Sequence, residues 1–180
     1  MEHKPWIGSN FKEGIKGKKI GILGNSHWLS DHEVDREDAS IDVVTKVMSQ
    51  EYNIAFFNQI RDYFGFRSHE DFWQSVMFMN YAPHSIGTSD KRFDHMTSAM
   101  AEMAKVRLGQ IISSHSPEKV FVFSKKIRWA LPPMIVHDST HPAVEAGEIV
   151  GHPGTTIYLL RHPQGAKKSD MLSAVGSALG

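Results

Sequence analysis

The fold is decided by the stretch Lys18-Lys19-Ile20-Gly21-Ile22-Leu23-Gly24-Asn25-Ser26-His27-Trp28. Its apolar run stops at Gly24, and polar side chains follow at once. A continuous apolar run of this length, bounded by a turn residue, is typical of a strand buried in a parallel sheet. Asn25, Ser26 and His27 would then stand at the carboxyl end of that strand, which is where ligands bind in open α/β sheets.

Three further apolar runs have the same form, so the expected strands are 19–24, 75–81, 119–124 and 156–161. Helical patterns are found at 43–64, 93–112, 125–131 and 169–179. Strands that alternate with helices predict a parallel sheet covered on both faces. We therefore predict an α/β fold, a three-layer α/β/α sandwich with a four-stranded parallel sheet, in a single domain over residues 1–180. Residues 1–17 are predicted as an N-terminal lid or edge segment, and residues 134–154 as a loop.

The composition restricts the classes of function and of partner. Lys plus Arg is 20 and Asp plus Glu is 20, so nucleic-acid binding would have to come from local clusters of cations. The absence of cysteine excludes disulfides and Cys-ligated zinc and fits a reducing compartment. The sequence has no signal-peptide pattern, no apolar run of membrane length and no glycine-rich phosphate motif. We expect a cytoplasmic monomer with no membrane partner, no cofactor and no metal.

Polar and basic residues gather after the four predicted strands. The strand ends present Asn25-Ser26-His27, Asn80-Tyr81, Ser124 and Arg161-His162. The basic residues that follow the last three strands are Lys91, Arg92, Lys125, Lys126, Arg128, Lys167 and Lys168. Cations on one rim of a neutral protein can follow a phosphate backbone, so these residues are predicted to bind single- or double-stranded DNA. The alternative is that they are ordinary solvated residues of exposed loops.

Three of these segments carry a resemblance to a known family. They are Gly24-Asn25-Ser26-His27-Trp28, Asn80, and His162-Pro163-Gln164-Gly165. Their order resembles that of the uracil-DNA glycosylase superfamily, whose members have a parallel sheet between helices and remove a flipped-out base from DNA. The resemblance implies catalytic roles for Asn25, Ser26 and His162. It implies base-binding roles for His27, Trp28, Asn80 and Tyr81.

The chemistry of base removal fits these residue types. Cleavage of an N-glycosidic bond develops positive charge on the sugar and negative charge on the departing base, which a donor such as His162 would stabilise. Asn80 offers a donor and an acceptor to a base edge. The first segment contains no acid, so either an amide takes that role, as in some members of the superfamily, or a carboxylate comes from Asp31, Glu33 or Asp35. We therefore expect a damaged or modified base as substrate rather than plain uracil.

Two other functions are compatible with the sequence. Gly24-Asn25-Ser26 and Asp138-Ser139-Thr140-His141-Pro142 resemble the G-D-S and D-x-x-H-P blocks of lipase/esterase-like hydrolases, in which Asp orients His to activate Ser. A non-catalytic module that binds nucleic acid or nucleotide is the other alternative. Metal binding by His137, Asp138, His141 and His152 is a weaker hypothesis, because the segment lacks a helical H-E-x-x-H frame.

Overall fold

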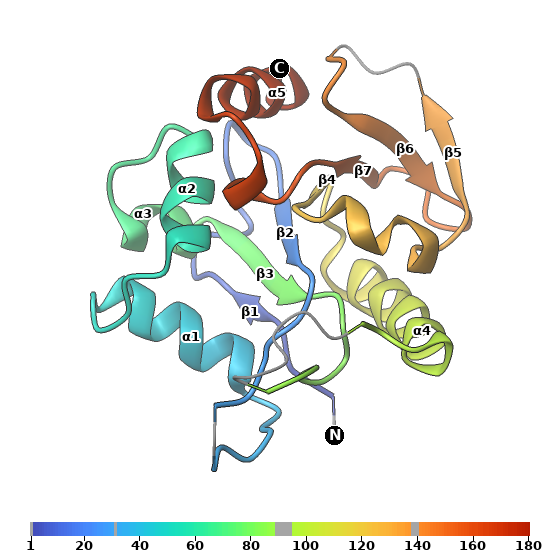
Figure 1. Cartoon of the computed structure of the whole chain (residues 1–180). Coiled ribbons are helices and arrows are strands. Elements are labelled where there is room, and N and C mark those ends of the chain that lie inside the picture. The colour runs from blue at the N-terminus through green and yellow to red at the C-terminus, as the bar shows by residue number, and fades with distance from the viewer. Residues whose placement is uncertain (1, 31, 89–94, 138–140) are drawn as a thin grey trace.

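The computed structural model describes residues 2–30, 32–88, 95–137 and 141–180. A mixed seven-stranded sheet runs through the described part of the chain, in the order β1-β3-β2-β4-β7-β6-β5 (Figure 1). Its centre consists of β2 (Ile20–Gly24), β3 (Val76–Asn80), β4 (Lys119–Val122) and β7 (Thr156–Leu159). These four strands are parallel neighbours. They correspond to the four predicted strands.

The prediction of a sheet with only these four strands is wrong, because three antiparallel strands extend it. β1 (Trp6–Ile7) pairs with β3 at one edge. At the other edge, β5 (Met134–His137) and β6 (Glu145–Ile149) form a hairpin, and β6 pairs with β7. The predicted loop at 134–154 thus contains two strands of the sheet. β6 contains two glutamates and a glycine. These residue types are uncommon in strands, so the sequence does not predict this strand, which is stabilised by pairing with its neighbours.

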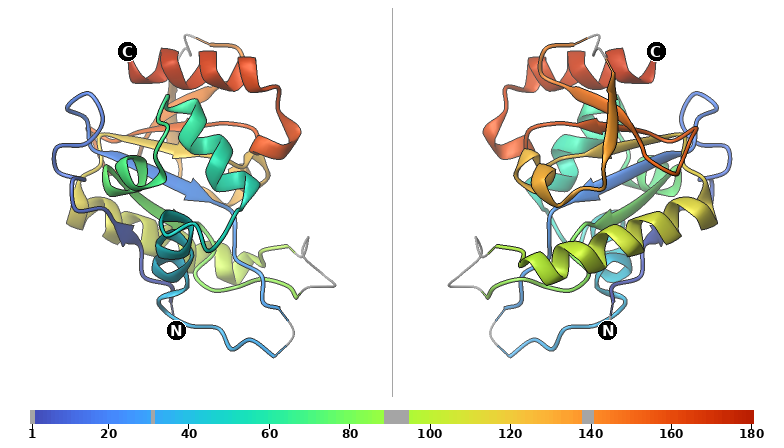
Figure 2. Two further views of the ribbon diagram at one scale, coloured as in Figure 1. Left: turned by 90° about the vertical axis from the view of Figure 1, so that its left-hand side faces the viewer. Right: turned by 90° about the vertical axis from the view of Figure 1, so that its right-hand side faces the viewer.

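Helices cover both faces of the sheet. The helices are α1 (Ala39–Met48), α2 (Ala55–Tyr63), α3 (His69–Gln74), α4 (Ser98–His115) and α5 (Lys168–Leu179), with short 3-10 helices η2 (Lys125–Ala130) and η3 (Pro163–Gly165). Figure 2 shows α4 and α5 on opposite sides of the sheet. Within the described residues, no helix is long and apolar enough to cross a membrane.

Alternation along the strands divides the core into two. Ile22, Phe78 and Phe121 pack with α1, α2, α3 and α5, on what we call the α2 face. Leu23 and Met79, one position further along their strands, pack with α4 and η2 on the α4 face. Successive side chains of a strand point to opposite faces of the sheet. A residue at a strand end therefore has the parity of the α2 face when it is an even number of positions away from Ile22, Phe78 or Phe121 in its own strand.

Candidate functional site

Gly24 and Asn80 lie side by side at the carboxyl ends of β2 and β3. They are direct partners in the parallel register, and both have the parity of the α2 face. A Cβ atom added at Gly24 would lie only 2.2 Å from Asn80 Oδ1. The asparagine side chain therefore leans across Gly24, and the absence of a side chain there makes room for the amide.

Phe56 joins this point from the first turn of α2, and sequence reasoning missed it. Its Cζ lies 3.4 Å from the position of a Cβ on Gly24, and its ring centroid lies 5.4 Å from that of His162 with the planes inclined by 31°. The apolar stripe that α2 buries contains Phe57 and Ile60. An aromatic residue one position off that stripe was the available signal. We call the group of Asn80, Phe56 and His162 the strand-end cluster. Gly24 lies between Asn80 and Phe56.

Asn80 is the unusual member of the strand-end cluster. The residue is 5% exposed, and its amide has no hydrogen-bond partner among the described residues; neither amide atom is fully buried, since the fully buried unpaired side-chain atoms of the described residues are His3 Nδ1 and Gln59 Oε1. The main-chain carbonyl of Asn80, by contrast, accepts a 2.9 Å hydrogen bond from Arg107 Nη1. An amide left unpaired at the ligand-binding edge of an α/β sheet is available to a ligand.

His162 contributes a donor whose tautomer is determined. It precedes η3 and its Nδ1 accepts a 3.3 Å hydrogen bond from the main-chain N–H of Gln164. Although His162 is exposed, desolvation of its ring, and then the charge of Lys126, lower its pKa. The ring is therefore neutral near pH 7, and since Nδ1 is an acceptor, the proton sits on Nε2. Nε2–H is left as a hydrogen-bond donor beside Phe56.

The loop after β2 is fixed by main-chain hydrogen bonds to the loop after β3. Ala82 N donates to the carbonyl of Asn25 at 2.9 Å, and Ile86 N donates to that of His27 at 2.8 Å. Within the described residues, the half-exposed side chains of Asn25 and Ser26 have no hydrogen-bond partner. Both side chains are thus presented on a rigid segment, where they can contact a ligand.

The other predicted base-binding residues differ in what they contact. His27 Nε2 lies 3.2 Å from Ser40 Oγ, so this ring is engaged with α1. Tyr81 is fully buried on the α4 face, where its hydroxyl donates a 2.6 Å hydrogen bond to the carbonyl of Ala130. Trp28 is 42% exposed. Of these three, Trp28 alone presents a large exposed surface.

A buried polar network lies next to this loop. His3 Nε2 lies 2.7 Å from Asp35 Oδ1, and Ser85 donates to both oxygens of that carboxylate. Burial acts to raise the pKa of Asp35, but the hydrogen bonds from Ser85 and His3 outweigh it and lower the pKa. Burial, and then the charge of His3, lower the pKa of His27, whose ring lies edge-on to His3, to about 4. The carboxylate of Asp35 is therefore held by hydrogen bonds to His3 and Ser85 and does not serve as the acid of the strand-end cluster.

Glu33, the remaining predicted carboxylate that the structure describes, does not supply an acid to the strand-end cluster. Glu33 accepts hydrogen bonds from the main-chain N–H and the hydroxyl of Ser30, on an exposed loop. Asp31 lies outside the described residues. Among the three candidates, the two that the structure describes are occupied within the protein. The strand-end cluster itself consists of uncharged groups.

The predicted DNA-binding residues divide into paired and unpaired cations. Arg128 forms an ion pair with Glu145, and Lys168 pairs with Asp62 at 2.7 Å. Lys125 and Lys167 are exposed and have no carboxylate partner among the described residues, and Lys126 is exposed beside Lys125. Lys91 and Arg92 lie outside the described part of the chain. The rim beside the strand-end cluster is therefore less positive than the count of cations suggests.

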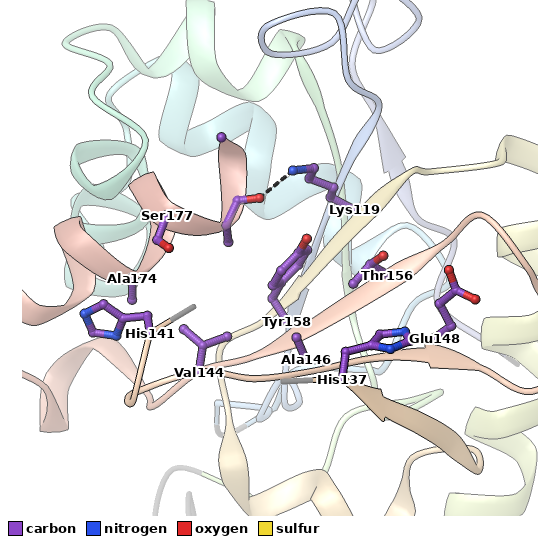
Figure 3. Close-up of a pocket in the computed structure, with 12 residues that line it drawn as sticks. Lys119, His137, His141, Val144, Ala146, Glu148, Thr156, Tyr158, Ala174 and Ser177 are labelled. Carbon is purple, nitrogen blue, oxygen red and sulfur yellow. Dashed lines mark hydrogen bonds between the residues drawn. The ribbon is translucent and has the colours of Figure 1, made fainter. Parts of the chain in front are cut away.

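The His-rich segment is distributed over both faces of the sheet. His137 and His141 line a cavity of about 370 Å³ between α5 and strands β6 and β7, with Tyr158 on its floor (Figure 3). His152 packs against Gly109 of α4, on the other face. No group of three His, Cys, Asp or Glu side chains within the described ranges is arranged to hold a metal ion.

The hydrolase hypothesis requires Ser26 and His141 to meet. His141 lies over β6 and β7, next to Ala174 of α5 (Figure 3). Ser26 follows β2, and β4 stands between β2 and β7 in the sheet. Asp138 lies outside the described residues. Within the described part, His141 Nδ1 accepts a hydrogen bond from the main-chain N–H of Ala143.

Comparisons with known proteins give no family for this chain. No family model matches the sequence, and no curated protein matches it. A solved structure that is similar in part is the crystal structure of a domain of unknown function (DUF1537) from Bordetella bronchiseptica, with bound citrate, as a domain-swapped dimer. The TM-score is 0.39 and the sequence identity 10%; the match covers 89% of this chain and spans 40% of that one. A likeness at this level identifies neither a family nor a function.

Proposed function

We propose that this protein is a cytoplasmic DNA glycosylase that hydrolyses the N-glycosidic bond of a flipped-out damaged or modified base. The observation that carries the proposal is the unpaired amide of Asn80, 5% exposed, in one cluster with Phe56 and His162. A flat aromatic face, an amide with both a donor and an acceptor, and a neutral imidazole N–H are the groups that recognise a nucleobase. The order of Gly24-Asn25-Ser26, Asn80 and His162 along the chain resembles that of the glycosylase superfamily.

The same groups account for leaving-group stabilisation. As the C–N bond breaks, its electron pair moves to the base, and the base becomes an anion. The Nε2–H of His162 donates a hydrogen bond to that anion, because Nδ1 is held as an acceptor by Gln164. The Asn80 amide reads the base edge, and Phe56 offers a ring for stacking. This arrangement acts most strongly when charge has developed, which is the condition for lowering the barrier.

The loop after β2 is assigned to the second part of the reaction, in which water adds to the sugar. A water molecule adds to the sugar carbon that loses the base, and the proton it gives up ends on the released base. Asn25 and Ser26 are the polar side chains of this loop with no hydrogen-bond partner among the described residues, so they are the groups assigned to hold that water. Neither is a strong base, and the main catalytic contribution is therefore assigned to His162.

The test is base release from a panel of oligonucleotides that carry uracil, deaminated, alkylated or bulky hydroxymethylated bases, measured by alkali-induced strand cleavage. We expect cleavage at one class of modified base, and a loss of about 100-fold or more in kcat for His162→Ala with DNA binding retained. Asn80→Asp should change which base is accepted, because it replaces the amide donor with an acceptor. Gln164→Ala is the matched control, because its main-chain N–H remains.

Two outcomes would transfer the assignment to another function. Absence of cleavage across the panel, together with ester hydrolysis that Ser26→Ala abolishes, would support the hydrolase. DNA binding without release of any base would support a non-catalytic module. Binding that is insensitive to salt would contradict DNA engagement by the rim, since contacts to phosphates release counterions.

A further inference from the structure

Within the described part of the chain, the outer edge of the sheet at β5 is an unoccupied strand edge. β5 pairs with β6 on one side and ends the strand order on the other, and Figure 1 shows it at the margin of the molecule. Ile135 is 60% exposed and Val136 is 55% exposed, and β5 contains no Asp, Glu, Lys or Arg. Proteins usually protect an exposed strand edge with a charged residue, a bulge or a cover, because free backbone groups recruit another strand.

The register determines which backbone groups point outward. Val150 N donates a 3.0 Å hydrogen bond to the carbonyl of Pro133, which lies directly opposite it. Hydrogen-bonded and non-hydrogen-bonded pairs alternate in an antiparallel ladder, so Ile135 and His137 also bond to β6. Met134 and Val136 therefore direct their N–H and C=O groups away from the sheet. Among the described residues, no main-chain group is bonded to these outward groups.

We propose that β5 pairs antiparallel with β5 of a second copy of this chain, about a two-fold axis at Ile135. This register pairs Met134 of each copy with Val136 of the other, and satisfies all eight outward N–H and C=O groups of those residues in four hydrogen bonds. Ile135 then faces Ile135 of the other copy as a non-hydrogen-bonded pair, the type with the closest side chains. The exposed Ile135 of one copy is then buried against Ile135 of the other, and the exposed Val136 against Met134 of the other.

A second copy fits this edge for two reasons. An antiparallel strand pair is two-fold symmetric, so the same four residues serve as both surfaces of an isologous contact. In addition, β5 carries no formal charge, so bringing two copies together creates no repulsion between like charges. The proposal is independent of the proposed glycosylase activity, because β5 contributes no residue to the strand-end cluster.

The pairing has a consequence for the cavity under α5. His137 lines that cavity and has the same parity as Ile135 (Figure 3). A two-fold axis perpendicular to a continuous sheet keeps equivalent faces on the same side. The cavities of both copies would therefore open on one face of a common sheet, separated by the paired β5 strands.

The test uses cysteine crosslinking, because the chain has no cysteine of its own. Ile135→Cys places two thiols across the axis with Cβ atoms about 4.5–5.5 Å apart, close to disulfide range. Under mild oxidation we expect most of this variant to run as a covalent dimer without reductant. Val106→Cys, at a position 63% exposed on α4, is the matched control and should remain mostly monomeric.

A second variant tests the backbone contact itself. Val136→Pro removes an outward N–H while leaving the inward bonds of Ile135 and His137, so the hairpin keeps its ladder. In analytical ultracentrifugation the unmodified chain should sediment as a dimer, and Val136→Pro should self-associate at least about tenfold more weakly. Circular dichroism checks that the variant is folded, and Ile135→Lys replaces it if it is not. A monomeric unmodified chain at about 100 µM, or equal crosslinking of both cysteine variants, would overturn the proposal.

Discussion

Substitution of Gly24 by alanine tests the geometry of the strand-end cluster most directly. The new Cβ would lie 2.2 Å from Asn80 Oδ1, whereas ordinary van der Waals contact begins at 3.4 Å. The amide oxygen therefore has to move by at least the difference, about 1.2 Å. A misplacement of about 1 Å in a group that orients substrate can cost about 100-fold in rate, so we expect that loss in kcat/KM for base release.

The fold itself should tolerate Gly24→Ala. The atom in the way is the end of a side chain that can rotate, and an off-rotamer side chain costs about 0.5–1.5 kcal/mol. For a domain of this size that corresponds to a fall in Tm of about 1–6 °C. Gly21→Ala is the matched control on the same strand, because its Cβ would meet the flexible end of Met77 at 3.0 Å. Equal activity of the two variants would refute the assignment of Asn80 to the site.

Three further perturbations have expected outcomes. The pKa of His27 is lowered from 6.5 to about 4, so the unfolded chain binds a proton at higher pH than the folded chain does. The free energy of unfolding therefore falls as the pH is lowered from about 6.5 to about 4. His27→Gln should remove this pH dependence, which amounts to at most about 3 kcal/mol and is measured by urea unfolding. Arg107 is buried and donates to two main-chain carbonyls, so Arg107→Met should lower the free energy of unfolding by about 2–5 kcal/mol, and a loss below 1 kcal/mol would contradict this role. Replacing the unpaired Lys125 and Lys167 by alanine should reduce the salt slope of DNA binding by about 2, whereas replacing Lys168, paired with Asp62, should change it less.

The central strands could be predicted because burial on both faces leaves an unambiguous pattern. β2 and β3 are continuous apolar runs and are buried at every position. The hairpin of β5 and β6 could not be predicted in the same way. β6 reads Glu-Ala-Gly-Glu-Ile, and a Cβ at its Gly147 would lie 2.7 Å from the carbonyl oxygen of Ile135. That glycine serves the close approach of two strands, which is a tertiary requirement without a local signature.

The candidate site was predictable to the extent that strand parity determines it. Gly24 and Asn80 end β2 and β3 with the parity of the α2 face, and His162 follows β7 of the same parallel sheet, so the three lie at one edge of that sheet. The same parity explains why Tyr81, next to Asn80, points to the opposite face and donates to Ala130 instead. The contacts of Phe56 with Gly24 and His162 depend on how α2 docks on the sheet, which the position of Phe56 beside the buried stripe of α2 does not determine.

In the proposed glycosidic cleavage, the composition of the strand-end cluster determines which half of the reaction it would assist. Phe56, Asn80 and His162 are uncharged near pH 7, since the pKa of His162 is lowered. Asp35, the described carboxylate in the network behind the loop after β2, is held by His3 and Ser85. A neutral N–H donor stabilises the anion that forms on the departing base. It carries no negative charge, so it does not attract the positive charge that develops on the sugar. Such a site would therefore lower the barrier by stabilising the departing base. Bases whose anions are intrinsically more stable are the ones it would release fastest.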